Sequence, residues 1–480
     1  MQRSLSAFAS FTDQCETVFK ILFFLYATMS FNCVTFGTFV ISLIMWPTFI
    51  LGALLILNRV LHLKRYRTPY MWWLAALLVA ACISFICNLQ YDLRMNILYI
   101  VTWAFYFLLL YVQPHERNAA ALKKELHLFA TLYTVVTEVA VIVSIGMLFA
   151  GYSVRVDFEG GRMLGGFVDS RLYGMFIDPN AGATCAAVAM FWLLHTMHRY
   201  QRVWQRAALG VGVALNLFYI ALSDSRTGMV VLLVIAFVYT LLSLLRLWKQ
   251  RRLAPLMALV SAAVIGLGCF CAPTLVKKGY NAAVSWWAVQ QAEQSADGSD
   301  APLTEAEKQA LIDSMTVHRD YDLSGDISNR RFSVWLSGVE IFLERPLFGT
   351  TYTGFTDFAR EHLPETYIVN NDHMDMNTFD NEIINTMVSN GVLGLIPLFV
   401  FAFGIFIFLV RRVGTFKDEQ TYRLATVGFA AVCGIAASAM FRSAILYYVS
   451  SNSVLFWALL GLLSMLCSAE KRGETHEQGH

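Results

Sequence analysis

The sequence predicts an all-α polytopic membrane protein with about 12 transmembrane helices and a large extracytoplasmic loop domain. Of its 480 residues, 57% are hydrophobic and 15% are charged, whereas a soluble domain carries about 25% charged residues. Apolar runs of about 17 to 25 residues recur along the chain, and each is long enough to cross a bilayer as a helix. The strands of a β-barrel would instead be short and alternating, so a β-barrel is excluded.

The apolar runs between polar breaks define the predicted spans. They lie at residues 18–33, 38–57, 70–87, 96–112, 129–150, 181–197, 207–223, 229–245, 254–275, 391–410, 424–440 and 445–467. Together they predict twelve crossings of the membrane.

The positions of the basic residues predict the orientation of these spans. Lysines and arginines gather in alternate loops, for example at 59–67, 117–124 and 246–252. By the positive-inside rule these loops are cytoplasmic, together with both termini. The predicted parts are an N-terminal membrane bundle of nine spans (1–275), a large extracytoplasmic loop domain (276–390), a C-terminal bundle of three spans (391–467) and a cytoplasmic tail (468–480).

The long outer segment is acidic and contains predicted helices. Residues 277–388 hold 18 aspartates and glutamates against 8 lysines and arginines, so we expect this segment to be exposed to solvent. The polar residues 290–302 predict a linker. Thr304 and Glu307 form a capping-box pattern that begins a helix ending near Met315. Apolar spacing predicts an amphipathic helix at 329–344, which Pro346 stops.

Arginines on the predicted outer face are candidates for function, because charges beside a membrane span are costly and mark functional sites. They are Arg94, Arg155, Arg162, Arg171, Arg226, Arg330, Arg331 and Arg442. Arg226 lies in a short turn between two spans, where its planar five-donor cation suits a lipid diphosphate at the membrane boundary. The alternative is an arginine that extends to the interface or pairs with Asp224.

A second polar segment runs from Arg171 to Asn180, just before the sixth span. Pro179 keeps Asp178 out of the helical region, and Asn180 suits a helix cap. Much of this segment is therefore explained by the start of a helix, but Arg171 is not.

A third polar segment lies where the long loop re-enters the membrane. Asp380 and Asn381 precede the span, and Gly391 and Gly394 follow within it. Stabilisation by the helix dipole is the structural alternative to a catalytic role for Asp380. The two glycines suit close packing against another helix.

Together these motifs resemble the O-antigen ligase and Wzy polymerase superfamily. The resemblance is carried by Ser225-Arg226-Thr227-Gly228, by Arg331 to Trp335 followed by Pro346 to Gly349, and by Asn381 with Gly391 and Gly394. The segment from Arg171 to Asn180 is similar to an Arg-Gly-Pro-Asn stretch of that family. The resemblance covers roughly residues 171–395, and the layout of twelve spans with a large outer loop fits the whole chain.

The resemblance implies a metal-independent, inverting glycosyltransferase of GT-C type in the bacterial inner membrane, with no cofactor. Its donor is a glycan on undecaprenyl diphosphate, and its acceptor is a lipid-linked repeat unit in a polymerase or lipid A-core in a ligase. Arg226 matches the arginine that holds the diphosphate, and Arg331 or its neighbour Arg330 matches a second essential arginine. Fixed guanidinium groups stabilise the charge that develops on a departing diphosphate.

The general base is where this chain departs from the family. Ligases of the family carry a histidine immediately before the Asn381 position, and this chain has Asp380 there. An aspartate of ordinary pKa is a weak base at neutral pH, although burial can raise its pKa. His373 is the second candidate base. The other predicted substrate-binding residues are Arg171, Asp224, Arg330, Trp335, Asn381 and Arg442.

The mismatch at Asp380 favours a polymerase of O-antigen, capsule or exopolysaccharide repeat units, with a ligase as the alternative. A transporter or flippase would need charged or Pro/Gly-broken spans at the bilayer midplane, whereas the predicted spans are almost free of charge. Expected partners are the lipid-linked oligosaccharide, the bilayer and a chain-length co-polymerase. The net charge of +2 gives no reason to expect nucleic acid, and the spacing of the nine cysteines predicts neither disulfides nor a zinc site.

Overall fold

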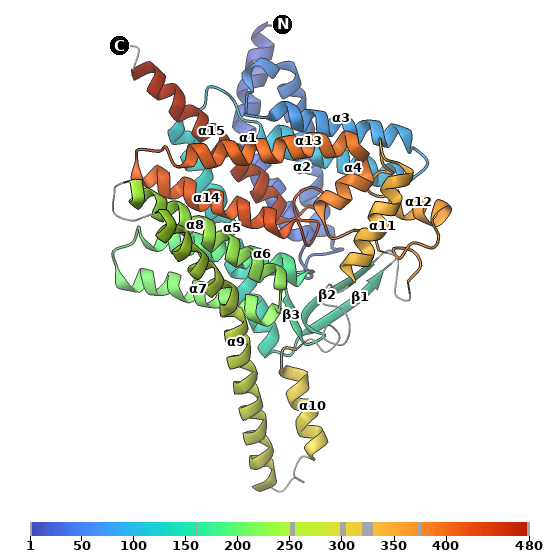
Figure 1. Ribbon diagram of the computed structural model, residues 1–480, viewed down its shortest axis with the longest axis vertical. Coiled ribbons are helices and arrows are strands. Elements are labelled where there is room, and N and C mark those ends of the chain that lie inside the picture. The colour runs from blue at the N-terminus through green and yellow to red at the C-terminus, as the bar shows by residue number, and fades with distance from the viewer. Residues whose placement is uncertain are drawn as a thin grey trace. The chain divides into compact units, whose positions relative to one another are not determined.

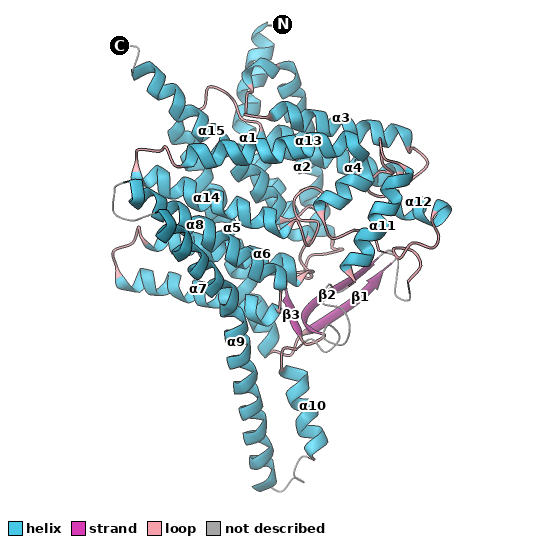
Figure 2. Cartoon of the chain, viewed as in Figure 1, coloured by secondary structure: helices cyan, strands magenta, loops and turns pink. Residues whose placement is uncertain are grey.

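The computed structural model of the protein describes residues 2–158, 161–249, 255–297, 304–318, 330–371 and 376–477. The described part is mostly helical and contains one small sheet (Figure 2). The chain forms two compact units, one of Met1–Tyr133 with Arg330–His480 and the other of Thr134–Asn329. The first unit therefore contains both ends of the chain, and the second is inserted between them in sequence.

Nine helices within the described ranges are long and apolar enough to cross a membrane, so the chain is a multi-pass membrane protein. They are α2 (Phe39–Leu61), α4 (Leu93–Ala104) with the π-helical segment that continues it (Phe105–Tyr111), α5 (Ala119–Phe149), α7 (Val203–Ser223), α8 (Arg226–Lys249), α9 (Pro255–Asp297), α13 (Glu382–Val413), α14 (Glu419–Ser438) and α15 (Ser451–Glu477). Each of these helices overlaps a predicted span.

The other three predicted spans coincide with α1 (Gln2–Ser30), α3 (Met71–Cys87) and α6 (Pro179–Met197). Helix α3 is apolar but has 17 residues, fewer than the roughly 20 that a crossing usually needs. The number of twelve crossings and the orientation of the chain therefore stay predictions.

In the first unit, α13, α14 and α15 pack with one another, and α15 also packs on the π-helical segment (Figure 1). Trp457 of α15 is buried, and its ring centroid lies 5.0 Å from that of Phe107 and 5.8 Å from that of Phe401. Aromatic pairs of this kind contribute about 0.5–1.5 kcal/mol each beyond the area they bury. The aromatic core of this unit thus holds α13 and α15 together.

Charged side chains are buried between α1, α2 and α5, although the spans were expected to carry almost none. Lys20 lies 2.6 Å from a carboxylate oxygen of Glu16 and 2.7 Å from one of Glu125. Arg59 pairs with the same Glu16 oxygen at 3.1 Å. Mutual pairing offsets the cost of removing these charges from water. All four lie near the predicted cytoplasmic ends of their spans, away from the predicted midplane.

In the second unit, helices α6, α7 and α8 pack together, and the chain between α5 and α6 forms a sheet that was not predicted (Figure 2). Strands β1 (Ser153–Phe158), β2 (Gly161–Val168) and β3 (Arg171–Gly174) are antiparallel in that order. Val154 and Val156 alternate with Arg155 and Asp157, which is the period of a strand. The fold is therefore helical with one small β-sheet.

Helix α9 is longer than predicted. The span was expected to end at residue 275, but the helix continues to Asp297. The first part of the predicted loop domain, including most of the predicted linker at 290–302, is therefore helical. The rest of that linker lies outside the described residues.

The predicted helices of the outer segment are confirmed. Helix α10 (Glu305–Met315) lies beside the end of α9 (Figure 1) and begins with the capping box of Thr304 and Glu307. Tyr280 of α9 donates to the Met315 carbonyl at 3.2 Å. Helix α11 (Arg331–Glu344) ends as predicted, two residues before Pro346, and α12 (Phe355–His362) follows it.

Candidate active site

Helix α11 carries the predicted second arginine of the site. Arg330 is the N-cap residue with a left-handed backbone, φ 65°, and Arg331 is the first helical residue. The Arg331 guanidinium carbon lies 6.0 Å from the centroid of the Phe441 ring. One turn later, Trp335 donates its indole N–H to the Phe379 carbonyl at 2.9 Å. These contacts fix α11 against the chain segments around residues 379 and 441.

Asn381 caps α13 at the predicted point of membrane re-entry. Its Oδ1 accepts hydrogen bonds from the amides of Ile383 at 2.9 Å and Ile384 at 3.2 Å, and its Nδ2 donates to the Met440 carbonyl at 3.1 Å. Asp380 is half-buried with φ 50°, a conformation that aspartate and asparagine tolerate better than most residues. Because Asn381 supplies the cap, capping does not account for Asp380.

The loop at 439–450, between α14 and α15, meets this helix start. Glu382 is buried, and its Oε1 accepts from the amides of Ile445 at 2.7 Å and Leu446 at 3.0 Å. The Glu382 amide donates to the Ala439 carbonyl at 2.9 Å. The twelfth span was expected to begin at residue 445, but this loop delays α15 to Ser451.

A second set of polar side chains joins the loop to α13. Asn385 donates to Ser443 Oγ at 2.6 Å and accepts from the Phe379 amide at 3.1 Å. Ser443 Oγ also lies 2.8 Å from Thr378 Oγ1. Arg442, which the sequence identified as a substrate-binding candidate, is buried with its guanidinium 5.5 Å from the centroid of the Phe31 ring. A structural role in the loop suits this buried position.

Two buried tyrosines stack near the loop. Tyr447 and Tyr352 have ring centroids 4.3 Å apart, and Tyr447 donates to Thr386 Oγ1 at 3.1 Å. Burial raises the pKa of both phenols above the usual value, so both stay protonated at neutral pH. Neither phenol is therefore a proton acceptor for the reaction at neutral pH.

Gly391 marks a break in α13. Its φ of 59° and ψ of −157° are outside the helical region, and a Cβ there would lie 2.4 Å from the Leu347 carbonyl oxygen. The Val392 amide donates to the Pro346 carbonyl at 2.8 Å. Gly391 therefore allows the backbone of α13 to break and the 346–349 motif to approach it closely. It was expected to allow close packing against another helix instead.

The second unit gathers the other predicted residues around the ends of β3, α7 and α8. Arg226 is exposed and is the first residue of α8. Arg171 of β3 donates from Nε to the Ser223 carbonyl at 3.0 Å. Asp224 pairs with Lys277 of α9 at 2.8 Å, a cation that the sequence did not identify.

Asn180 has a different role from the predicted one. Asp178 is the N-cap of α6, and its Oδ1 accepts from the Asn180 amide at 2.8 Å. Asp178 is extended (φ −126°, ψ 119°), as the following proline predicts. The Asn180 side chain instead accepts from Ser225 Oγ at 2.7 Å, and Ser225 Oγ accepts from the Gly228 amide at 3.0 Å. These bonds join the segment from Arg171 to Asn180 to the Ser225-Arg226-Thr227-Gly228 motif.

The candidates divide between the two units. Arg330, Arg331, Trp335, Asp380, Asn381 and Arg442 belong to the first unit, and Arg171, Asp224 and Arg226 belong to the second. His373 lies outside the described residues. Sequence reasoning missed Glu382, Asn385 and Ser443. Glu382 and Asn385 could have been noticed as polar residues in the first turn after Asn381, whereas Ser443 carries no such signal.

Comparison with known proteins supports the motif assignment. Residues 211–399 match the family model for O-antigen ligase. The match includes Arg226, Arg331 and Asp380, whereas Arg171 and Arg442 lie outside it. A search of curated proteins found no match. The resemblance to the O-antigen ligase and Wzy polymerase superfamily is thus confirmed over these residues.

Proposed function

We propose that this chain, which carries an O-antigen ligase family domain over residues 211–399, is a polysaccharide repeat-unit polymerase. The proposed donor is a glycan on undecaprenyl diphosphate, and the proposed acceptor is a second lipid-linked repeat unit. The observation that carries the proposal is the start of α13, where Asp380 precedes the cap that Asn381 supplies. Helix α11 packs beside this segment, because Trp335 donates to the Phe379 carbonyl and Arg331 lies over the Phe441 ring. A carboxylate and a fixed cation beside a membrane span suit glycan transfer from a lipid diphosphate.

In the proposed reaction, a hydroxyl oxygen of the acceptor sugar attacks the anomeric carbon of the donor glycan. The new carbon–oxygen bond forms as the bond from that carbon to the diphosphate breaks, so the configuration inverts. Asp380 takes the proton of the attacking hydroxyl, and undecaprenyl diphosphate leaves with the bonding electrons. A positioned base of this kind contributes about 10²- to 10⁴-fold to the rate. No step is assigned to a metal ion.

Arg226 and Arg331 are proposed to stabilise the charge of the diphosphate. Arg226 is exposed at the first residue of α8, where the positive end of the helix dipole also favours an anion. A guanidinium offers two parallel donors to a phosphate, which a lysine ammonium does not. Charge stabilisation that grows towards the transition state accelerates the chemical step.

A polymerase is favoured over a ligase because Asp380 stands where ligases of the family carry a histidine. The ligase remains the second candidate, since the matching family model is described as O-antigen ligase. Purified protein in vesicles, supplied with lipid-linked repeat units, should lengthen them into a ladder of polymers. Transfer of finished glycan onto added lipid A-core, with no such ladder, would assign the ligase function instead.

The arginine assignments are tested in the same assay. Arg226→Ala and Arg331→Ala should each reduce polymer formation by about 10²-fold or more while expression in the membrane stays normal, and Arg226→Lys should restore little. Arg423→Ala is the matched control, because Arg423 pairs with Glu419 at 2.7 Å on the exposed surface of α14. Polymer of normal length and amount from Arg226→Ala would rule out the diphosphate role.

A further inference from the structure

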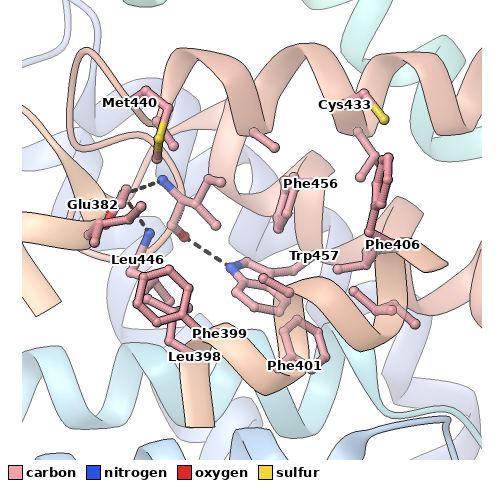
Figure 3. A pocket seen from close by; sticks show the side chains of 18 of the residues that line it. Glu382, Leu398, Phe399, Phe401, Phe406, Cys433, Met440, Leu446, Phe456 and Trp457 are labelled. Carbon is pink, nitrogen blue, oxygen red and sulfur yellow. Dashed lines mark hydrogen bonds between the residues drawn. The ribbon is translucent and has the colours of Figure 1, made fainter. Parts of the chain in front are cut away.

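An apolar cavity lies inside the first unit, next to the start of α13. Its volume is about 220 Å³, and its walls come from α13, α14, α15 and the 439–450 loop (Figure 3). Aromatic and aliphatic side chains such as Phe401, Phe456 and Leu460 form most of the lining. The indole N–H of Trp457 already donates to the Ile445 carbonyl at 2.9 Å. The cavity therefore presents a hydrocarbon-like interior.

Glu382 supplies the carboxylate of this cavity. Its side chain is buried, and Oε1 accepts from the amides of Ile445 and Leu446 (Figure 3). The other oxygen, Oε2, is buried and has no hydrogen-bond partner among the described residues. Leaving a buried carboxylate oxygen unpaired is costly. A ligand that brings a hydrogen-bond donor into the cavity would remove this cost.

The rim of the cavity is open to the outside of the protein. Phe399 and Phe406 line the cavity and are also 36% and 50% exposed. Both belong to α13, which is long and apolar enough to cross a membrane, so the surrounding medium at this rim is lipid hydrocarbon. Apolar cavities of this size stay dry and take up apolar molecules. Glu382 begins the span, so the polar end of the cavity lies at the expected level of lipid head groups.

We propose that this cavity binds an uncharged, hydroxyl-bearing membrane lipid. Its hydrocarbon chain fills the space between α13, α14 and α15, and its hydroxyl group donates a hydrogen bond to Glu382 Oε2. A phosphorylated head is disfavoured, because its charge has the same sign as the carboxylate. The proposal therefore concerns a site for an uncharged lipid, and it does not depend on the proposed reaction.

Photolabelling of the purified full-length protein tests the proposal without turnover. The probes are hexadecanol with a diazirine near its chain end, the methyl ether of the same alcohol, and its phosphate ester. The alcohol should label residues of the cavity lining and should bind roughly tenfold to a hundredfold more tightly than the ether, which lacks the donor. Equal binding of alcohol and ether, or tighter binding of the phosphate, would overturn the proposal.

Two substitutions locate the site. Glu382→Gln keeps an oxygen for the two loop amides but presents an amide N–H₂ to the cavity, so the preference for alcohol over ether should disappear. Ala436→Leu fills the cavity from α14 and should abolish labelling, whereas Ala437→Leu, on the same helix but outside the lining, should not. Labelling that survives Ala436→Leu would contradict the location. If that variant does not fold, the alcohol-to-ether ratio in the wild type and in Glu382→Gln still decides.

Discussion

We predict that Asn381→Ala and Asn381→Asp destabilise the protein by different amounts, because the two polar atoms of Asn381 serve different partners. Oδ1 caps α13 through the amides of Ile383 and Ile384, and Nδ2 holds the Met440 carbonyl. Aspartate keeps an oxygen at the cap but loses the donor to Met440, so its second oxygen faces the Met440 carbonyl oxygen. Alanine loses both functions.

The magnitudes follow from these contacts. Removing an asparagine cap costs about 0.5–2 kcal/mol, and losing one intramolecular hydrogen bond costs about 0.5–1.5 kcal/mol. Asn381→Ala should therefore cost about 2 kcal/mol and Asn381→Asp about 1 kcal/mol. The added negative charge lies beside Asp380 and Glu382, and the helix N-terminus partly offsets that repulsion.

The assay is unfolding of the purified protein by sodium dodecyl sulfate in mixed micelles, followed by tryptophan fluorescence. Asn370→Ala is the control, because Asn370 is an exposed asparagine whose side chain contacts Glu365 at 3.2 Å. Equal losses for the two Asn381 variants would show that the Met440 contact, and not the cap, carries the effect. An unchanged Asn381→Ala protein would refute the reasoning altogether.

Three further predictions concern α11, the orientation of the chain and α14. Trp335→Phe removes the bond to the Phe379 carbonyl, so stability should fall by about 1 kcal/mol in the same titration; an unchanged midpoint would mean that this bond does not hold α11. A topology reporter after Trp287 should read as external and one after Arg252 as cytoplasmic, and a cytoplasmic signal at Trp287 would invert the map. Hydrogen bonds from the Thr421 side chain and amide lower the pKa of Asp418. Ionised Asp418 therefore stabilises the folded protein above its unfolded pKa of about 3.9, and this stabilisation is lost as the pH falls through the lower folded pKa. The stability difference between wild type and Asp418→Asn should therefore shrink below about pH 4, and a pH-independent difference would contradict the assignment.

Structural features that depend only on residues close together in the sequence were predictable. The long apolar runs predicted helices because hydropathy is a local property, and each predicted span coincides with a helix. The capping box at Thr304 and the end of α11 before Pro346 are also local, and both are confirmed. The motifs around Arg226, Arg331 and Asp380 were found for the same reason.

Features that depend on distant partners were not predictable. Glu382 looks like an ordinary first-turn acid, since its partners Ile445 and Leu446 lie far along the chain. The cap of α6 was assigned to Asn180 because either Asp178 or Asn180 fits the local pattern, and the contact with Ser225 decides between them. The sheet of β1 to β3 was missed because its longest strand has 8 residues, so its alternation is a weak signal beside the apolar helices.

The rate of polymer formation by Asp380→Asn decides whether Asp380 is the general base. Asparagine tolerates the left-handed backbone at this position, where φ is 50°, so it removes the carboxylate without the strain that alanine would add. With purified lipid-linked repeat units, Asp380→Asn should lower the initial rate by about 10²- to 10⁴-fold, while the unfolding midpoint stays that of the wild type and His373→Ala costs little. A wild-type rate from Asp380→Asn would contradict the proposed mechanism, and leaving-group stabilisation by Arg226 and Arg331 would then have to carry the reaction.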